Sequence, residues 1–245
     1  MWSPIRLLDA TLPTVAENLA LDEALLIDAE DHEGPAVLRI WELDHFAVVM
    51  GASDRLLQNV RLDACRLDDV ALGRRSSGGG TVVIGPGALN VSVVLPIAAA
   101  SELKGVDTAQ GFVLGRTAGA IRAAGPAVEV LGSGDLTLGG RKFSGSAQRR
   151  LRHQVLIHAS LLYDFPLDRI DRYTLMPPRR PVYRGDRPHG EFVTNLPLDR
   201  PRLVSALLGG WLLDPSRPEL ATVPEPLVRS LVATKFSLAS WIERL

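Results

Sequence analysis

Residues 74–95 read RRSSGGGTVVIGPGALNVSVVL and carry the clearest structural signals in this chain of 245 residues. β-Prone runs predict strands at 70–75 and 81–84, with a glycine-rich break between them. After a Gly-Pro-Gly turn, the alternation of side chains over 89–95 predicts a half-buried strand. The centre of the predicted fold is therefore a glycine loop held between strands.

The glycine loop combines three consecutive glycines, Gly78 to Gly80, with the preceding Arg74 and Arg75. Glycine lets the backbone approach a ligand closely and turn several N–H groups to one side. Such an array beside two arginines binds phosphate or carboxylate. The alternative is a flexible hairpin loop with exposed arginines. The loop has neither P-loop nor Rossmann spacing, so a nucleotide site here would belong to another architecture.

A second glycine-bearing stretch, residues 132–146, reads GSGDLTLGGRKFSGS. Its Gly-Gly pair predicts a two-residue hairpin, and alternation along the second strand predicts that Lys142 and Ser144 share a face. Lys142 would there stabilise negative charge on an acyl carboxylate or an adenylate phosphate. Asp135 would hold Mg²⁺ together with phosphate oxygens. The alternative is a surface hairpin with a solvated lysine and an Asx turn at Asp135.

The remaining pattern predicts one α/β domain over residues 1–245. A capping box at Thr14–Glu17 predicts a helix over 15–29, and Asp107 is the predicted cap of a helix that ends at Ala123. Residues 176–192 hold four prolines and four arginines and predict a long functional loop. Further helices are predicted at 55–67, 203–213 and 227–241, and further strands at 37–41, 46–50 and 155–163.

Composition excludes several classes of protein. A hydrophobic content of 46% and a net charge of −1 exclude a disordered chain. No apolar run approaches the roughly 20 residues that span a bilayer, and residues 1–6 lack the features of a signal peptide. The sequence therefore predicts a soluble, cytoplasmic protein. The single cysteine, Cys65, excludes an internal disulfide framework and is predicted to be a buried, inert thiol.

Charge and histidine placement bear on the ligands. Between Arg141 and Gly190 there are 11 basic and 4 acidic residues, a local charge of +7 that favours an anionic ligand or an acidic partner. No recognised nucleic-acid-binding motif accompanies this charge. No pair of histidines has metal-ligand spacing with a third ligand. His158, in an alternating run, is predicted to be a satisfied histidine of a sheet face.

Together these segments resemble the lipoate–protein ligase A family, within the group of biotin and lipoate ligases and octanoyltransferases. The matching pieces occur in family order over about residues 15–200. Two of them, Arg-Arg-x-x-Gly-Gly-Gly and Gly-Arg-Lys-x-Ser-Gly-Ser-Ala, are specific. The matching segments are Glu17–Ala20, Arg74–Gly80, Gly87–Asn90, Asp135 with Gly140–Ala147, His158–Leu162 and Val193–Leu196.

The resemblance implies a mixed, largely antiparallel sheet flanked by helices, with an apolar tunnel for a lipoyl or octanoyl chain. It implies that Lys142 is catalytic and contacts the acyl carbonyl region, and that Asp135 lies near magnesium and phosphate. Residues 176–192 would match a mobile loop that orders over the activated acyl group. The residues that would bind substrate or adenylate are Arg74, Arg75, Ser76, Ser77, Gly78, Gly79, Gly80, Asn90, Gly145, Ser146, Ala147 and His158.

The implied reaction attaches lipoate or octanoate to a lysine of a lipoyl domain through an acyl-adenylate formed from ATP and Mg²⁺, with no tightly bound cofactor. The alternative is acyl transfer from a carrier protein, which in this group commonly uses a cysteine thioester. Neither 128–134 nor 172–178 contains a cysteine. Transfer is therefore the weaker candidate.

A third hypothesis is a non-catalytic module that binds lipoate or a lipoyl domain. It rests on two departures from the family pattern. Ile84 stands where a histidine is common, and the family's C-terminal accessory domain has no counterpart in the sequence, so activation is expected to need a separate accessory subunit or to be absent. A milder departure is Ala159-Ser160 after His158, where the family often has x-Gly.

Overall fold

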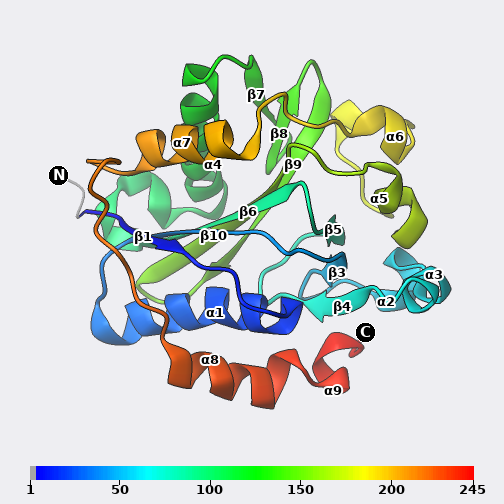
Figure 1. Ribbon diagram of the computed structural model, residues 1–245, viewed down its shortest axis with the longest axis horizontal. Coiled ribbons are helices and arrows are strands. Elements are labelled where there is room, and N and C mark those ends of the chain that lie inside the picture. The colour runs from blue at the N-terminus through cyan, green and yellow to red at the C-terminus, as the bar shows by residue number, and fades with distance from the viewer. Residues whose placement is uncertain (1–3) are drawn as a thin grey trace.

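Seven strands form the main sheet of the computed structural model, which describes residues 4–245 (Figure 1). The first two strands pair in parallel, and every other neighbouring pair in this sheet is antiparallel. The predicted mixed, largely antiparallel sheet is therefore confirmed. Its strands are, in spatial order, β1 (Arg6–Asp9), β2 (Val37–Trp41), β6 (Ala88–Pro96), β10 (Gln154–Leu162), β9 (Arg141–Arg150), β8 (Asp135–Leu138) and β7 (Val128–Leu131).

A smaller sheet carries the glycine loop. Its central strand is β3 (Ala47–Met50), which pairs in parallel with β4 (Ala71–Arg74) and antiparallel with β5 (Val82–Ile84). The glycine loop joins β4 to β5 across the end of β3. Both strands that flank the loop lie where the sequence predicted them.

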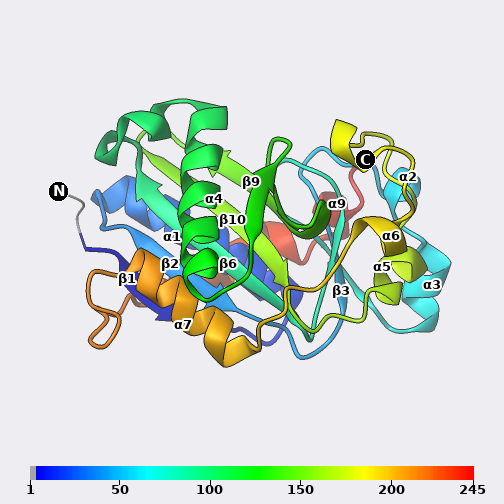
Figure 2. The ribbon, with the colours of Figure 1, turned by 90° about the horizontal axis from the view of Figure 1, so that it is seen from above.

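Helices cover the two faces of the main sheet. On one face lie α1 (Val15–His32) and, beyond it, α8 (Glu225–Leu231), with which it shares a hydrophobic core (Figure 1). On the other face lie α4 (Val106–Ala123) and α7 (Arg200–Trp211), which Figure 2 shows in front of the strands. Because both faces are covered, β6 is buried along almost its whole length. The prediction of a half-buried strand there was wrong.

Short helical segments complete the chain. Their bounds are α2 (Leu56–Asn59), α3 (Leu62–Leu67), η1 (Ile97–Ala99), η2 (Ser101–Lys104), α5 (Asp168–Tyr173), η3 (Val182–Arg184), α6 (His189–Phe192), η4 (Val232–Phe236) and α9 (Ala239–Ile242). Within residues 4–245, no helix is long and apolar enough to cross a membrane. The first three residues of the stretch inspected for a signal peptide lie outside the described part.

Several predicted helices differ from the observed ones at their ends. Thr14 and Glu17 make both bonds of the capping box, as predicted, and α1 runs on to His32. The helix predicted at 55–67 is interrupted, because Val60 leaves the helix to pair with Thr174. The N-cap of α4 is Gly105, and Asp107 lies in its first turn. The helix predicted at 227–241 is broken into α8, the π-helical η4 and α9.

Candidate functional site

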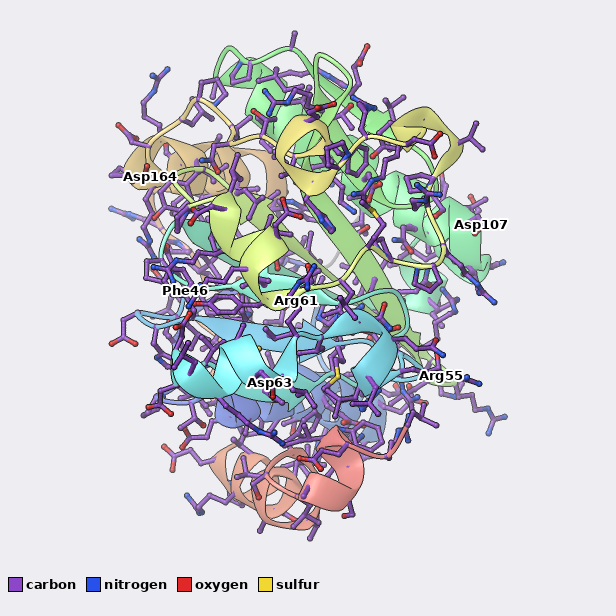
Figure 3. All side chains as sticks on the ribbon, turned by 90° about the vertical axis from the view of Figure 1, so that its right-hand side faces the viewer. Phe46, Arg55, Arg61, Asp63, Asp107 and Asp164 are labelled. Carbon is purple, nitrogen blue, oxygen red and sulfur yellow. The ribbon has the colours of Figure 1, made fainter. Side chains whose placement is uncertain are left out.

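A cavity of about 520 Å³ opens between the main sheet, the small sheet and residues 176–192. Figure 3 views the molecule from the side of α2, α3 and α5, and Arg61, labelled there, lies between α3 and α5. Its backbone N–H donates a hydrogen bond of 2.9 Å to the carbonyl oxygen of Tyr173, and this bond connects α3 to α5. Both predicted glycine-bearing stretches reach the cavity: Gly79 and Gly80 from one, and Lys142 with Gly145 from the other.

The hairpin of β8 and β9 places Lys142. Gly139 and Gly140 turn the chain with φ of 56° and 71°, a region that glycine adopts without strain. The register then shifts between Leu136 and Thr137, so that Lys142 lies opposite Thr137. This irregularity changes which residues share the face of Lys142, because a slip of one residue reverses the alternation.

The prediction that Lys142 and Ser144 share a face was wrong for this reason. Ser144 lies opposite Leu136 and Leu161, two residues of the hydrophobic core. Gly145, opposite Asp135, takes the place on the face of Lys142. A Cβ at Gly145 would lie 2.8 Å from Nζ of Lys142, so a glycine there leaves room for the ammonium group.

Lys142 is paired with Asp135. Its Nζ lies 2.6 Å from Oδ1 of Asp135, and the lysine side chain is 29% exposed. The other carboxylate oxygen, Oδ2, accepts a hydrogen bond of 2.7 Å from the hydroxyl of Tyr183. Burial and the nearby Asp135 raise the pKa of Tyr183, so the phenol stays protonated and donates. The amine of Lys142, predicted to be catalytic, therefore lies at the cavity wall. Asp135 links it to Tyr183 of residues 176–192.

Tyr183 was missed by the sequence analysis. It lies 48 positions from Asp135 in the chain, and no local pattern marks it. The proline- and arginine-rich composition of residues 176–192 was the available signal, and it indicated the segment but not the residue. Residues that line the cavity from this segment are Pro177, Arg179, Arg180, Pro181, Arg184, His189 and Phe192.

Arg75 closes the glycine loop on itself. Its guanidinium donates to the carbonyl oxygens of Gly78 and Gly80 at 2.6 and 2.8 Å, and its Nε donates to Oγ of Ser77 at 3.1 Å. Burial lowers the pKa of Arg75 to about 10. A Cβ at Gly79, where φ is +85°, would lie 2.8 Å from Arg75 and 3.7 Å from Cβ of Ala147. The loop is therefore packed against β9, the strand that also carries Lys142.

Arg74 does not reach the cavity. Its side chain is fully buried, and it donates to the carbonyl oxygens of Gly51, Asp54 and Ile242 at 2.6–2.9 Å. Successive side chains of an extended chain point to opposite sides, so the two arginines separate. The structure thus places Arg74 under the loop, where it anchors the C-terminal segment, and the ligand contact implied for it by resemblance is not supported by this geometry.

The other implied binding residues divide into two groups. Asn90, Gly145, Ser146, Ala147 and His158 line the cavity together with Arg75, Gly79, Gly80 and Asp135. Ser76, Ser77 and Gly78 belong to the loop but do not line the cavity, and Ser76 and Ser77 are buried. His158 is satisfied by Asp22 and Ser77, so the prediction of a satisfied sheet-face histidine is confirmed.

One end of the cavity is apolar. Ile84 is buried in the core shared with α1 and lines the cavity with Leu19, Trp41, Val49 and Val82. An apolar side chain where the family commonly has histidine thus extends the apolar wall. Cys65 is buried outside the cavity lining, and burial raises the pKa of its thiol. The predicted inert thiol matches this environment, although Leu67 beside it is 80% exposed.

The side chains that line the cavity do not by themselves surround a metal ion. Among residues 4–245, no group of three or more His, Cys, Asp or Glu side chains lies together as metal ligands would. Two carboxylates line the cavity, Asp22 and Asp135, and Asp22 is already bound by Arg39. One carboxylate is enough for Mg²⁺ when substrate phosphates supply the other oxygens. Asp135 is the carboxylate of the lining that lies beside Lys142, and to hold the ion it would exchange its bonds to Lys142 and Tyr183 for the metal.

Comparison with known proteins gives a consistent family. The lipoyl protein ligase A/B catalytic domain matches residues 14–200. A protein of Aeropyrum pernix named "Putative lipoate-protein ligase A" is 32% identical over 169 residues, which are 69% of this chain and 61% of that protein. The octanoyltransferase LipM of Symbiobacterium thermophilum is 30% identical over 202 residues, which are 73% of this chain and 72% of LipM.

Solved structures share the fold. A bi-partite lipoate protein ligase of Thermoplasma acidophilum, studied with its E2 lipoyl domain, superposes with a TM-score of 0.84 over 98% of this chain and 96% of its own, at 22% identity. A lipoate-protein ligase A crystallised with bound ATP superposes with a TM-score of 0.82 over the whole of both chains, at 23% identity. The chain spans less than two thirds of the length of the Aeropyrum protein.

Proposed function

The chain belongs to the lipoyl protein ligase A/B catalytic domain family, and from this premise we propose that it attaches lipoate, or octanoate, to a lysine of a lipoyl domain through an acyl-adenylate formed from ATP. One observation carries this proposal. Lys142 and the closed glycine loop line a single cavity that has an apolar end. Activation of a carboxylate needs charge stabilisation and positioning but no side-chain nucleophile, which matches this set of residues.

In the first step, a carboxylate oxygen of the acid attacks the α-phosphorus of ATP. The bond from that phosphorus to the bridging oxygen breaks, and pyrophosphate leaves with the electron pair. In this proposal the ammonium of Lys142 would neutralise the reacting carboxylate and α-phosphate. The backbone at Gly79 and Gly80, which lines the cavity, would let phosphate oxygens approach closely. Asp135 would hold Mg²⁺, whose chemistry is to neutralise phosphate charge.

In the second step, the neutral amine of the acceptor lysine attacks the acyl carbonyl carbon of the mixed anhydride. An amide bond forms, AMP leaves with the anhydride oxygen, and the amine loses one proton to solvent. Negative charge develops on the carbonyl oxygen during the attack. In this proposal Lys142, one of the cations that line the cavity, would stabilise that charge.

A second candidate is direct octanoyl transfer from a carrier protein. The similarity to LipM over 72% of that octanoyltransferase favours it. The placement of Cys65 disfavours a covalent route, because that thiol is buried outside the cavity lining and no other cysteine exists in the chain. Non-catalytic binding of lipoate remains as the third candidate, and Ile84 in the apolar wall is the observation that favours it.

The acceptor would be a lipoyl domain, and a separate accessory subunit is a further proposed partner. The bi-partite ligase of Thermoplasma and its E2 lipoyl domain support both partners. The local charge of +7 between Arg141 and Gly190 suits an acidic acceptor. No nucleic acid and no membrane enter this proposal, and we place the reaction in the cytoplasm.

The test is modification of a purified apo lipoyl domain, followed by intact-mass spectrometry. One reaction contains lipoate and Mg·ATP, a second contains octanoyl-acyl-carrier protein without ATP, and a third contains lipoate without ATP. The proposal expects acylation in the first reaction alone. Acylation in the second reaction would establish transfer. Calorimetric lipoate binding with no acylation in any reaction would leave the binding module.

A further inference from the structure

A buried polar chain connects α1 to the glycine loop. Asp22 of α1 is 2% exposed, and its Oδ1 accepts a bond of 2.6 Å from Nη1 of Arg39. Its Oδ2 accepts from Oγ of Ser92 at 2.8 Å and lies 3.1 Å from Nδ1 of His158. The Nε2 atom of His158 lies 2.6 Å from Oγ of Ser77 in the glycine loop. These hydrogen bonds connect α1, through His158 of β10, to Ser77 in the glycine loop.

The positions of the hydrogens follow from the partners. Burial alone would raise the pKa of Asp22, but Arg39, His158 and Ser92 outweigh it and hold the pKa below its ordinary value. Asp22 is therefore an acceptor, and Nδ1 of His158 must donate to it. Nε2, on the other side of the ring, is hydrogen-bonded to the hydroxyl of Ser77 at 2.6 Å. Oγ of Ser77 in turn accepts from Nε of Arg75 at 3.1 Å.

The order Ser–His–Asp is that of a hydrolase triad, but the serine is placed for a different role. Ser77 is 1% exposed and does not line the cavity. Its carbonyl oxygen accepts from the N–H of Ala52 at 2.8 Å, so its backbone is held as well. An acyl carbonyl in the cavity has no path to Oγ of Ser77. What Ser77 does contact is Arg75, the residue that closes the loop.

We propose that His158 is a positioning residue: its Nε2 holds Ser77, and through Ser77 and Arg75 it fixes the glycine loop at the cavity wall. Asp22, itself bound by Arg39, orients the imidazole for this contact. The inference rests on the proposed function only for the identity of the ligand that the loop would bind. It adds to the cavity contact implied for His158 a second role, that of holding the glycine loop.

Two substitutions separate the two bonds of His158. The amide of asparagine can take the place of Nδ1 and donate to Asp22, but it does not extend to Ser77. The amide of glutamine can take the place of Nε2 and present Oε1 to the hydroxyl of Ser77. We expect H158N and S77A to speed hydrogen exchange of the amide of Ala52, which donates to the carbonyl of Ser77, by about 3- to 10-fold, the effect of one lost hydrogen bond. H158Q should restore the wild-type rate, and H153N, at an exposed histidine, should leave it unchanged.

The exchange experiment uses the unliganded protein, so it stands apart from the reaction. Wild-type rates in H158N with fast exchange in H158Q would overturn the proposal, because His158 would then serve Asp22. Wild-type rates in S77A would overturn it too, and S77A keeps the test open if both His158 variants fold poorly. An octanoyl ester at Ser77, found by peptide mass spectrometry after incubation with octanoyl-acyl-carrier protein, would make the serine a nucleophile instead.

A binding measurement links the loop to the ligand. By calorimetry with lipoic acid and Mg·ATP, H158N and S77A should bind ATP about 3- to 10-fold more weakly than H158Q and the wild type. If the wild type binds neither ligand while the exchange pattern holds, the proposed function fails and the positioning role of His158 stands. Equal ATP affinity in all four proteins would contradict a role for the loop in nucleotide binding.

Discussion

The glycine loop and residues 176–192 line the same cavity but are held in place differently. The loop is bonded from several sides: Arg75 closes it, His158 holds Ser77, and Ser77 receives the N–H of Ala52. Residues 176–192 are joined to the rest of the protein mainly through side chains, by the bond from Tyr183 to Asp135, that from Arg187 to the carbonyl of Gly140, and that between His189 and Asp171. Val182 at its centre is fully exposed.

Arginine has opposite uses in these two regions. In the glycine loop, Arg75 is buried and its donors fix the loop to a strand of the small sheet, including a bond of 3.3 Å to the carbonyl of Val49. In the other segment, Arg184 and Arg187 each donate to the other's carbonyl oxygen at 3.0 Å. Residues 176–192 thus make part of their hydrogen bonds within the segment. We expect the wall formed by the glycine loop to be fixed and the wall formed by residues 176–192 to yield.

Replacement of Lys142, which lies between the two walls, should have the largest effect. K142A removes the cation from the cavity wall, so we expect lipoyl-domain modification to slow by about 10²–10³-fold, the usual cost of losing one preorganised charge-stabilising group. The lysine side chain is 29% exposed, so the midpoint of urea unfolding should hardly change. K104A, at an exposed lysine, is the matched control. Wild-type activity in K142A would remove this lysine from the reaction.

Replacement of the two arginines tests the difference between the walls. R75M leaves the carbonyls of Gly78 and Gly80 without their donor, and we expect it to lower the free energy of unfolding by about 2–4 kcal/mol. R187M removes partly exposed bonds, and we expect a loss of less than about 1 kcal/mol. Urea denaturation measures both. Equal losses would mean that the two walls are equally fixed.

We expect the bond from Tyr183 to Asp135 to control how readily residues 176–192 become accessible to a protease. Y183F keeps the aromatic ring but loses the bond to Asp135, so trypsin should cleave the Arg179–Arg180 bond about 5- to 10-fold faster, in line with the loss of one hydrogen bond. Y163F is the matched control, because Tyr163 makes an equivalent bond of 2.8 Å to Glu42 outside the cavity lining. Equal cleavage rates in the wild type and Y183F would show that other contacts hold the segment.

The smallest effect is expected at the start of α1, which carries Asp22 of the fixed wall. T14A removes the capping box, so the free energy of unfolding should fall by about 1 kcal/mol. The cleavage rate at Arg179–Arg180 should stay at its wild-type value, because α1 supports the wall formed by the glycine loop and not residues 176–192. Thermal unfolding with parallel trypsin digestion measures both quantities. A faster cleavage in T14A would mean that the two walls are coupled through the core.

Features that depend on neighbouring residues could be predicted from the sequence, and contacts between distant segments could not. The capping box and the Gly139–Gly140 hairpin depend on neighbouring residues, and both are present as predicted. The separation of Arg74 from Arg75 was available in principle, since neighbours in an extended chain face opposite sides. The bulge that moves Ser144 to the core face, and the contact of Tyr183 with Asp135, depend on strand pairing and on segments far apart in the chain. No local pattern encodes them.

The most direct test of adenylate formation is the exchange of radiolabelled pyrophosphate into ATP, with Mg²⁺ and lipoate present and no lipoyl domain. Our account predicts label in ATP that depends on lipoate and is lost in K142A, since the first step is reversible and needs no acceptor. Absence of exchange in the wild type, together with octanoylation of a lipoyl domain from octanoyl-acyl-carrier protein, would contradict the account.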